Sequence, residues 1–140
     1  MKKIRLSVLT PEKVMINDLE VDSVTLPAYN GEMGILPDHI PYVAQIKEGL
    51  LKYKRNGIEE YISIFWGFCY IKNNEVTVLT EIGELAKELD EEKARQEFQK
   101  AKEAIHMKKP DLDIEAAQAS LKKAIVRLKL AELKKNNYKK

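Results

Sequence analysis

The chain has little of what stabilises secreted or membrane-inserted proteins. Cys69 is the only cysteine among its 140 residues, which rules out an internal disulfide framework. It lies in the apolar run 65–70, which favours a small buried side chain over a reactive thiol, and we expect a reducing cytoplasm as its compartment. No stretch approaches the about 18–20 apolar residues that span a membrane. The basic start lacks the apolar region and cleavage site of a secretory signal.

Motifs of catalysis and cofactor binding are also missing. The sequence contains no Walker-type glycine loop, no dinucleotide fingerprint and no cysteine or histidine cluster typical of zinc sites. The two histidines, His39 and His106, are far apart in the chain. Asp38-His39 leaves open an acid–base pair of a small hydrolase, although no nucleophile lies in a recognisable elbow. We therefore expect neither a catalytic residue nor a metal site.

Charge is distributed unevenly along the chain. Nine Lys and Arg against twelve Asp and Glu give residues 1–84 a net charge of −3, and fifteen against ten give residues 85–140 a charge of +5. The lysines of the second part alternate with glutamates, which is typical of a solvated helix face rather than of a nucleic-acid-binding surface. Two parts with different charge and periodicity predict two structural units, residues 1–84 and 85–140.

The first unit shows the alternation of β-strands. Short alternating runs recur every 8–12 residues and are separated by turn residues such as Asn56-Gly57. This pattern predicts an antiparallel sandwich or a flattened barrel. The expected strands are residues 3–10, 14–16, 21–26, 42–46, 50–54, 58–64, 67–71 and 76–80.

Turn-forming residues are most concentrated in residues 26–41, which we call the proline corner. It holds three of the five prolines and two of the six glycines. Asn30-Gly31 predicts a tight turn, because both residues tolerate positive φ, and each proline fixes φ near −65°. On physical grounds alone, the proline corner is a rigid bend of an all-β domain with no stated purpose.

The second unit has the periodicity of helices. It contains no glycine, and its only proline, Pro110, separates two apolar stripes with helical spacing. Asp90 and Asp113 are the expected N-caps. A short connection between two amphipathic helices predicts an antiparallel hairpin. The first stripe comprises Leu89, Ala94, Phe98, Ala101 and Ile105, and the second Ile114, Ala117, Leu121, Ala124, Ile125, Leu128 and Ala131.

Several motifs, in order across both units, make the chain resemble the epsilon subunit of the F-type ATP synthase. The most specific motif is in the proline corner and reads Leu26-Pro27-x-x-x-Gly31-Glu32-x-Gly34-Ile35-Leu36-Pro37-x-His39-x-Pro41. The others are Lys47-Glu48-Gly49, Gly67-Phe68, Val76-Thr77-Val78-Leu79, Leu89-Asp90-Glu91, Ala116-Ala117-Gln118-Ala119 and Lys123-Ala124-Ile125-x-Arg127-Leu128. One departure is Trp66, where the family commonly has a second glycine, and it puts a local strand twist in question.

The resemblance implies an α+β fold, with a ten-stranded antiparallel β-sandwich over residues 1–84 and an antiparallel two-helix hairpin over residues 85–140. It implies a non-catalytic subunit of the central stalk, at the cytoplasmic face of the bacterial cell membrane and attached there only through the complex. The sandwich would bind the gamma subunit and the ring of c subunits, with Glu32 and His39 near this foot. The subunit would turn with the rotor and couple proton flow to ATP synthesis.

The resemblance also implies that the hairpin is regulatory. Folded, it would lie against the sandwich; extended, it would reach the alpha and beta subunits and inhibit ATP hydrolysis. The sequence leaves open which state is adopted at rest. The basic outer face of the second helix would then meet an acidic segment of the catalytic subunits, through Lys122, Lys123, Arg127 and Lys129.

A regulatory ATP site is the second implication for the hairpin, although no cofactor is required. Some bacterial members hold ATP through an Ile/Leu-Asp-x-x-Arg-Ala motif, which here reads Leu89-Asp90-Glu91-Glu92-Lys93-Ala94. The accompanying basic pair falls on Lys123 and Arg127, one helical turn apart, and Glu84 matches a further position. Lysine at 93 and 123 offers a point charge where arginine offers a planar fork. Alternatively, Asp90 only caps its helix and the basic pair is solvated or contacts gamma.

A different class of function also fits the sequence, namely a free-standing β-sandwich that binds proteins and dimerises through its helical tail. Co-purification with a gamma-like coiled coil would separate this alternative from the rotor subunit.

Overall fold

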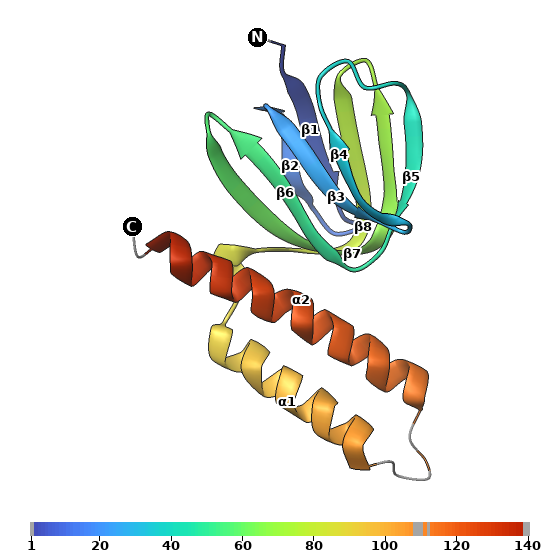
Figure 1. The fold of residues 1–140 in the computed structure, drawn as a ribbon, viewed down its shortest axis with the longest axis vertical. Coiled ribbons are helices and arrows are strands. Elements are labelled where there is room, and N and C mark those ends of the chain that lie inside the picture. The colour runs from blue at the N-terminus through green and yellow to red at the C-terminus, as the bar shows by residue number, and fades with distance from the viewer. Residues whose placement is uncertain (1, 108–110, 112, 139–140) are drawn as a thin grey trace. The chain divides into compact units, whose positions relative to one another are not determined.

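The computed structural model describes residues 2–107, 111 and 113–138, and the chain divides into two compact units, Met1–Glu84 and Leu85–Lys140 (Figure 1). The strands of the first unit are β1 Ile4–Leu9, β2 Val14–Val21, β3 Ser23–Ala28, β4 Gly31–Ile35, β5 Tyr42–Ile46, β6 Gly49–Arg55, β7 Ile58–Lys72 and β8 Glu75–Leu85. The helices are the short 3-10 helix η1 Ala86–Glu88, α1 Glu91–Met107 and α2 Ile114–Tyr138. This order confirms the predicted fold class, a β-sandwich followed by a helical hairpin.

The strands pair in the order β2-β1-β8-β7-β5-β3-β4, and β6 pairs with both β3 and β7. The register between β1 and β8 is parallel, from Arg5 opposite Glu75 to Leu9 opposite Leu79, whereas the other registered pairs are antiparallel. The described residues form eight strands, so the expected number of ten was wrong. One reason is that residues 58–72 run as a single strand, although the sequence pattern divides them in two.

The continuity of β7 depends on a bend at Trp66 and Gly67, which have φ values of 57° and 154°. Residues before the bend pair with β6 and residues after it pair with β5, so one strand serves both halves of the rolled sheet. Thr80 holds the bend from β8: its buried hydroxyl accepts the Phe65 N–H at 3.2 Å and lies 3.0 Å from the Trp66 carbonyl oxygen. The tryptophan therefore takes a backbone conformation that favours glycine while the fold stays intact.

Alternating apolar side chains fill the centre of the sandwich, as the strand pattern predicts. On β1 the side chains of Ile4, Leu6 and Val8 are buried, while those of Arg5 and Ser7 are not. Other fully buried side chains come from most of the remaining strands: Val21, Leu26, Ile35, Ile46, Leu51, Ile62, Ile64 and Phe65. Cys69 is also fully buried, and this burial raises the pKa of its thiol to about 12, which confirms its role as a small buried side chain.

The proline corner begins with a hairpin, and hydrogen bonds join its other end to a neighbouring turn. Strands β3 and β4 pair through Ala28 and Gly31, so the tight turn is centred on residues 29–30, one residue before the predicted Asn30-Gly31 pair, of which only Gly31 has a positive φ. At the far end, Asn74 Oδ1 accepts the Asp38 N–H at 2.6 Å, and Asp38 Oδ2 binds Lys2 Nζ at 2.9 Å. The hydrogen bonds from Lys2 and then Asn74 hold the pKa of the Asp38 carboxyl below its usual value. The corner is thus tied to the β7–β8 turn and to the N-terminal segment.

The second unit is a hairpin of two capped helices. Asp90 and Asp113 are confirmed as N-caps: Asp90 Oδ1 accepts the N–H of Glu92 and of Lys93 at 3.0 and 3.2 Å, and Asp113 Oδ1 that of Ala116 at 3.1 Å. Pro110, the expected breaker, lies outside the described residues. Among the described residues, no helix combines the length and apolar character needed to cross a bilayer.

Small side chains form much of the contact between α1 and α2. Both stripes predicted for these helices contain buried alanines: Ala94 and Ala101 on α1, and Ala124 and Ala131 on α2. The second stripe is wrong at Ile114, which is 60% exposed, and it omits two buried residues of α2, Val126 and Leu130. At about 100° per residue, Val126 lies about 160° around the helix from Ala124 and Leu130 about 100° from Ala131, so these two are on a different side of α2 from the alanines.

Candidate functional site

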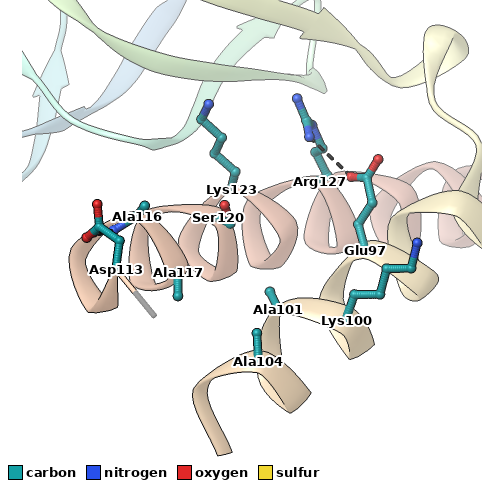
Figure 2. Close-up of a pocket in the computed structure, with 10 residues that line it drawn as sticks. All are labelled: Glu97, Lys100, Ala101, Ala104, Asp113, Ala116, Ala117, Ser120, Lys123 and Arg127. Carbon is teal, nitrogen blue, oxygen red and sulfur yellow. Dashed lines mark hydrogen bonds and ion pairs between the residues drawn. The ribbon is translucent and has the colours of Figure 1, made fainter. Parts of the chain in front are cut away.

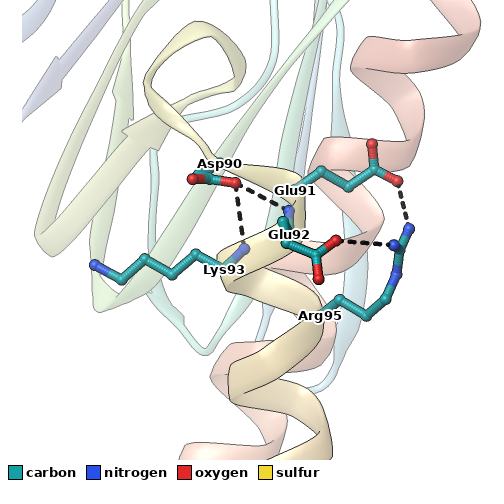
Figure 3. Close-up of polar contacts among 5 residues, drawn as sticks. All are labelled: Asp90, Glu91, Glu92, Lys93 and Arg95. Atoms are coloured by element: carbon teal, nitrogen blue, oxygen red, sulfur yellow. Dashed lines mark hydrogen bonds and ion pairs between the residues drawn. The ribbon is translucent and has the colours of Figure 1, made fainter.

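The N-terminus of α1 carries the motif that resembles the ATP-binding sequence. The Asp90 carboxylate is engaged in capping the helix (Figure 3). Arg95 forms ion pairs with two residues at the start of α1, with Glu91 at 2.8 Å and with Glu92 at 3.3 Å. Ala94 is buried and Leu89 half-buried, so the apolar members of the motif belong to the packing of the hairpin.

A groove of about 620 Å³ lies between α1 and α2 (Figure 2). Its volume falls within the range of about 300–1,000 Å³ that is usual for small-molecule sites. Alanines make up much of its apolar surface, and charged side chains from both helices surround them. The lining residues are Glu97, Lys100, Ala101, Ala104, Asp113, Ala116, Ala117, Ser120, Lys123 and Arg127.

The groove is electropositive. Lys100, Lys123 and Arg127 contribute three positive charges, against Glu97 and the helix-capping Asp113. Lys123 and Arg127 lie on the same side of α2, as one helical turn requires (Figure 2). Arg127 Nη1 binds Glu97 Oε2 across the two helices at 3.2 Å. The arrangement suits an anionic ligand whose phosphates meet the cations.

The structure brings together some of the predicted site residues and not others. Lys123 and Arg127 share the groove, whereas Leu89, Asp90 and Ala94 are not among its lining residues. Glu84 belongs to the first unit, where its carboxylate accepts a hydrogen bond from Ser63 Oγ at 3.2 Å.

Among the charged residues of the groove, Glu97 and Lys100 are predicted from the sequence neither as site residues nor as helix caps. One signal was available for Lys100: it follows Lys93 by seven residues and therefore shares its helix face. For Glu97 the sequence carries no such signal, because its partner is thirty residues away on the other helix.

Residues predicted to contact other subunits lie on two exposed surfaces. Lys122 and Lys129 are exposed on one face of α2, since they are seven residues apart. In the proline corner, Glu32 is exposed and His39 half-exposed. His39 Nδ1 lies 2.7 Å from the Ile40 carbonyl oxygen, while the Asp38 carboxylate binds Lys2 and Asn74, so the two neighbours face different partners. This geometry does not support Asp38-His39 as an acid–base pair.

A second groove of about 620 Å³ lies on the β-sandwich. Three of its apolar side chains are well exposed, Tyr29, Phe68 and Leu79, and Phe68 is 47% accessible. Exposed apolar side chains that gather around one concavity mark an interaction surface. The groove is lined by Leu9, Thr10, Pro11, Tyr29, Gln45, Ile46, Trp66, Gly67, Phe68, Leu79, Thr80 and Glu81.

Comparison with known families assigns both units. The model of the ATP synthase delta/epsilon chain β-sandwich domain matches residues 3–86, and that of its long α-helix domain matches residues 87–132. The chain belongs to the ATP synthase delta/epsilon family. This delta/epsilon chain is 34% identical to the ATP synthase epsilon chain of Symbiobacterium thermophilum, over 94% of both chains. It is 38% identical to that of Desulforamulus reducens, over 91% of this chain and 96% of the relative.

Solved structures share the fold of this delta/epsilon chain. A chain in the OSCP/F1/c-ring structure of the Euglena gracilis mitochondrial ATP synthase superposes with a TM-score of 0.77 at 22% identity. The match covers 87% of this chain and 77% of that one. A chain in the central stalk/c-ring structure of the Tetrahymena thermophila enzyme gives 0.55 at 14% identity, over 92% and 93%.

Proposed function

We propose that this delta/epsilon chain is the non-catalytic central-stalk subunit of a proton-translocating F-type ATP synthase. The observation that carries the proposal is that the two family models occupy residues 3–132 in order, and that bacterial relatives matching over more than nine-tenths of the chain are named ATP synthase epsilon chain. In this role the subunit turns with the rotor at the cytoplasmic face of the membrane, couples proton flow to ATP synthesis, and restrains ATP hydrolysis through its hairpin.

The sandwich groove supports binding to the gamma subunit. It offers exposed aromatic and aliphatic side chains, the kind of surface that anchors protein–protein interfaces. The proline corner is the surface proposed for the c-ring, with Glu32 and His39 beside the exposed apolar side chains of Leu36 and Ile40. Its ties to Lys2 and Asn74 stiffen the corner, which suits an element that must transmit torque.

Replacing Phe68 with glutamate should weaken binding of the full chain to its gamma subunit by at least about tenfold, because burying an aromatic anchor typically carries a large share of interface energy. Ile58→Glu is the matched control, since Ile58 is 64% exposed on the same strand and lies outside the groove. Calorimetric titration measures both variants. A chain that forms dimers and ignores gamma would instead support the free-standing binding module.

The groove between the helices supports a regulatory ATP site on the folded hairpin. Its three cations can meet the phosphates, and its apolar alanine surface leaves room for the rest of the nucleotide. Of the residues expected at this site, Lys123 and Arg127 would meet the phosphates, and Asp90 and the backbone near Leu89 would meet adenine or ribose. The large share of alanine in the helix contact also suits a hairpin with two alternative partners, because small side chains bury little area in either state.

The isolated full chain should bind ATP with Mg²⁺ with a dissociation constant below about 1 mM, and Arg127→Gln should weaken this binding about tenfold, since charge-assisted bonds to phosphate are among the stronger polar contacts. Lys102→Gln is the control, because Lys102 is exposed on α1 and does not line the groove. Isothermal titration calorimetry reports both. Absence of heat at millimolar nucleotide would contradict the ATP site and leave the stalk assignment standing.

A further inference from the structure

The cation best placed for phosphate in the helical groove already has an anionic partner. Arg127 of α2 binds Glu97 of α1 at 3.2 Å, and the side chains are only 23% and 39% exposed (Figure 2). Both residues line the groove, so the ion pair lies within the space that a ligand would enter. An incoming phosphate must therefore compete with this carboxylate for the same guanidinium.

We propose that Glu97 is an internal competitor for the phosphate subsite and sets how tightly this chain holds ATP. The inference rests on the proposed ATP site of the hairpin. The carboxylate opposes binding in two ways: it competes with the phosphates for Arg127, and its negative charge repels the phosphates that come close to it. The same contact joins α1 to α2, so phosphate binding also affects a bond between the two helices.

The groove also contains an alternative partner for the displaced carboxylate. Lys100 lies three residues after Glu97 on the same helix and lines the same groove. Residues at this spacing are neighbours on a helix surface, so Glu97 can turn from Arg127 towards Lys100 without unwinding α1. Phosphate binding then becomes an exchange of ion pairs, in which Arg127 goes to the ligand and Glu97 to Lys100.

Titration of the full chain with ATP and Mg²⁺, and separately with inorganic tripolyphosphate, tests this exchange. Glu97→Gln keeps the size and polarity of the side chain and removes its charge, and it should tighten binding of both ligands about tenfold. The control is Glu103→Gln, because Glu103 is exposed on α1 and does not line the groove. It should alter neither constant by more than about twofold, since an exposed charge is largely screened by solvent and salt.

A double-mutant cycle assigns the effect to the ion pair. In an Arg127→Gln background, Glu97→Gln should give less than half of its usual gain in free energy, because the bond that it removes no longer exists. Wild type that binds ATP, with Glu97→Gln no tighter, would overturn the inference and leave the ATP site in place. Failure of wild type and Glu97→Gln alike to bind either ligand would overturn the ATP site and the inference together.

Discussion

Replacing Gly67 with alanine should unfold the β-sandwich or lower its free energy of unfolding by about 4 kcal/mol or more, the range reached when a substitution forces backbone apart. A Cβ atom at this position would lie 1.9 Å from the Leu79 carbonyl oxygen and 2.9 Å from the Thr80 Cα. Both contacts are with backbone of the neighbouring strand and cannot be relieved by a rotamer change. The φ of 154° adds strain, because residues with a side chain rarely adopt it.

Gly34→Ala is the matched control, since a Cβ there meets nothing within 4 Å. Urea titration followed by tryptophan fluorescence reports on the sandwich, because Trp66 is the only tryptophan and adjoins the bend. Gly34→Ala should shift the unfolding midpoint little, whereas Gly67→Ala should abolish the cooperative transition or move it to much lower urea. Equal midpoints for the two variants would show that the bend of β7 does not need the close approach to β8.

Reversing the charge of Lys122 and Lys129 together should raise ATP hydrolysis by the assembled synthase about tenfold. Both side chains are exposed on one face of α2, which is the face we propose to meet acidic residues of the catalytic subunits. Each reversed contact replaces an attraction by a repulsion, and two changes of about 0.7 kcal/mol each amount to a factor of ten in the population of the inhibited state.

The control is the double reversal Lys87→Glu and Lys102→Glu, which changes the net charge equally at exposed positions outside α2. Hydrolysis is measured on the complex assembled from its own subunits, at fixed ATP and ionic strength. Similar rates for the two double variants would mean that total charge, rather than this face of α2, controls the inhibition. Salt should screen the attraction in wild type and the repulsion in the Lys122 and Lys129 variant, so higher salt should raise the rate of wild type and lower that of the variant. The opposite pair of salt responses would also argue against the proposed contact.

Much of the strand pattern follows from side-chain alternation, which is a local property. The pattern predicts a strand over residues 42–46, and β5 spans Tyr42–Ile46. It does not predict β4, because the five residues of that strand include two glycines and little alternation. Strand β4 forms because it pairs with β3 along its whole length, from Ala28 opposite Gly31 to Val24 opposite Ile35.

In the candidate site, too, local spacing predicts some residues and only helix packing brings in the others. The spacing of Lys123 and Arg127 is enough to place them on one helix face, because the helical period alone determines it. Their neighbours Glu97 and Lys100 come from α1 and depend on how the two helices pack. The sequence therefore predicts a basic pair and misses the carboxylate that faces it.

Trp66 is an example within the sandwich of a conformation that the local sequence does not predict. Tryptophan stands where the family commonly has glycine, and the neighbouring residues do not predict which local strand twist results. The answer lies in β8, where Thr80 binds the backbone of Phe65 and faces that of Trp66. The bend is held from another strand, so the positive φ of Trp66 is tolerated.

Local patterns were sufficient for the division at residue 84, the class of each unit, the helix caps and the resemblance to a family. Those features depend on residue type, spacing and order along the chain. The parallel register of β1 with β8, the unbroken course of β7, and the pairing of Glu97 with Arg127 each join residues distant in sequence. Such contacts form only when packing brings their partners together, and no period within one segment encodes them.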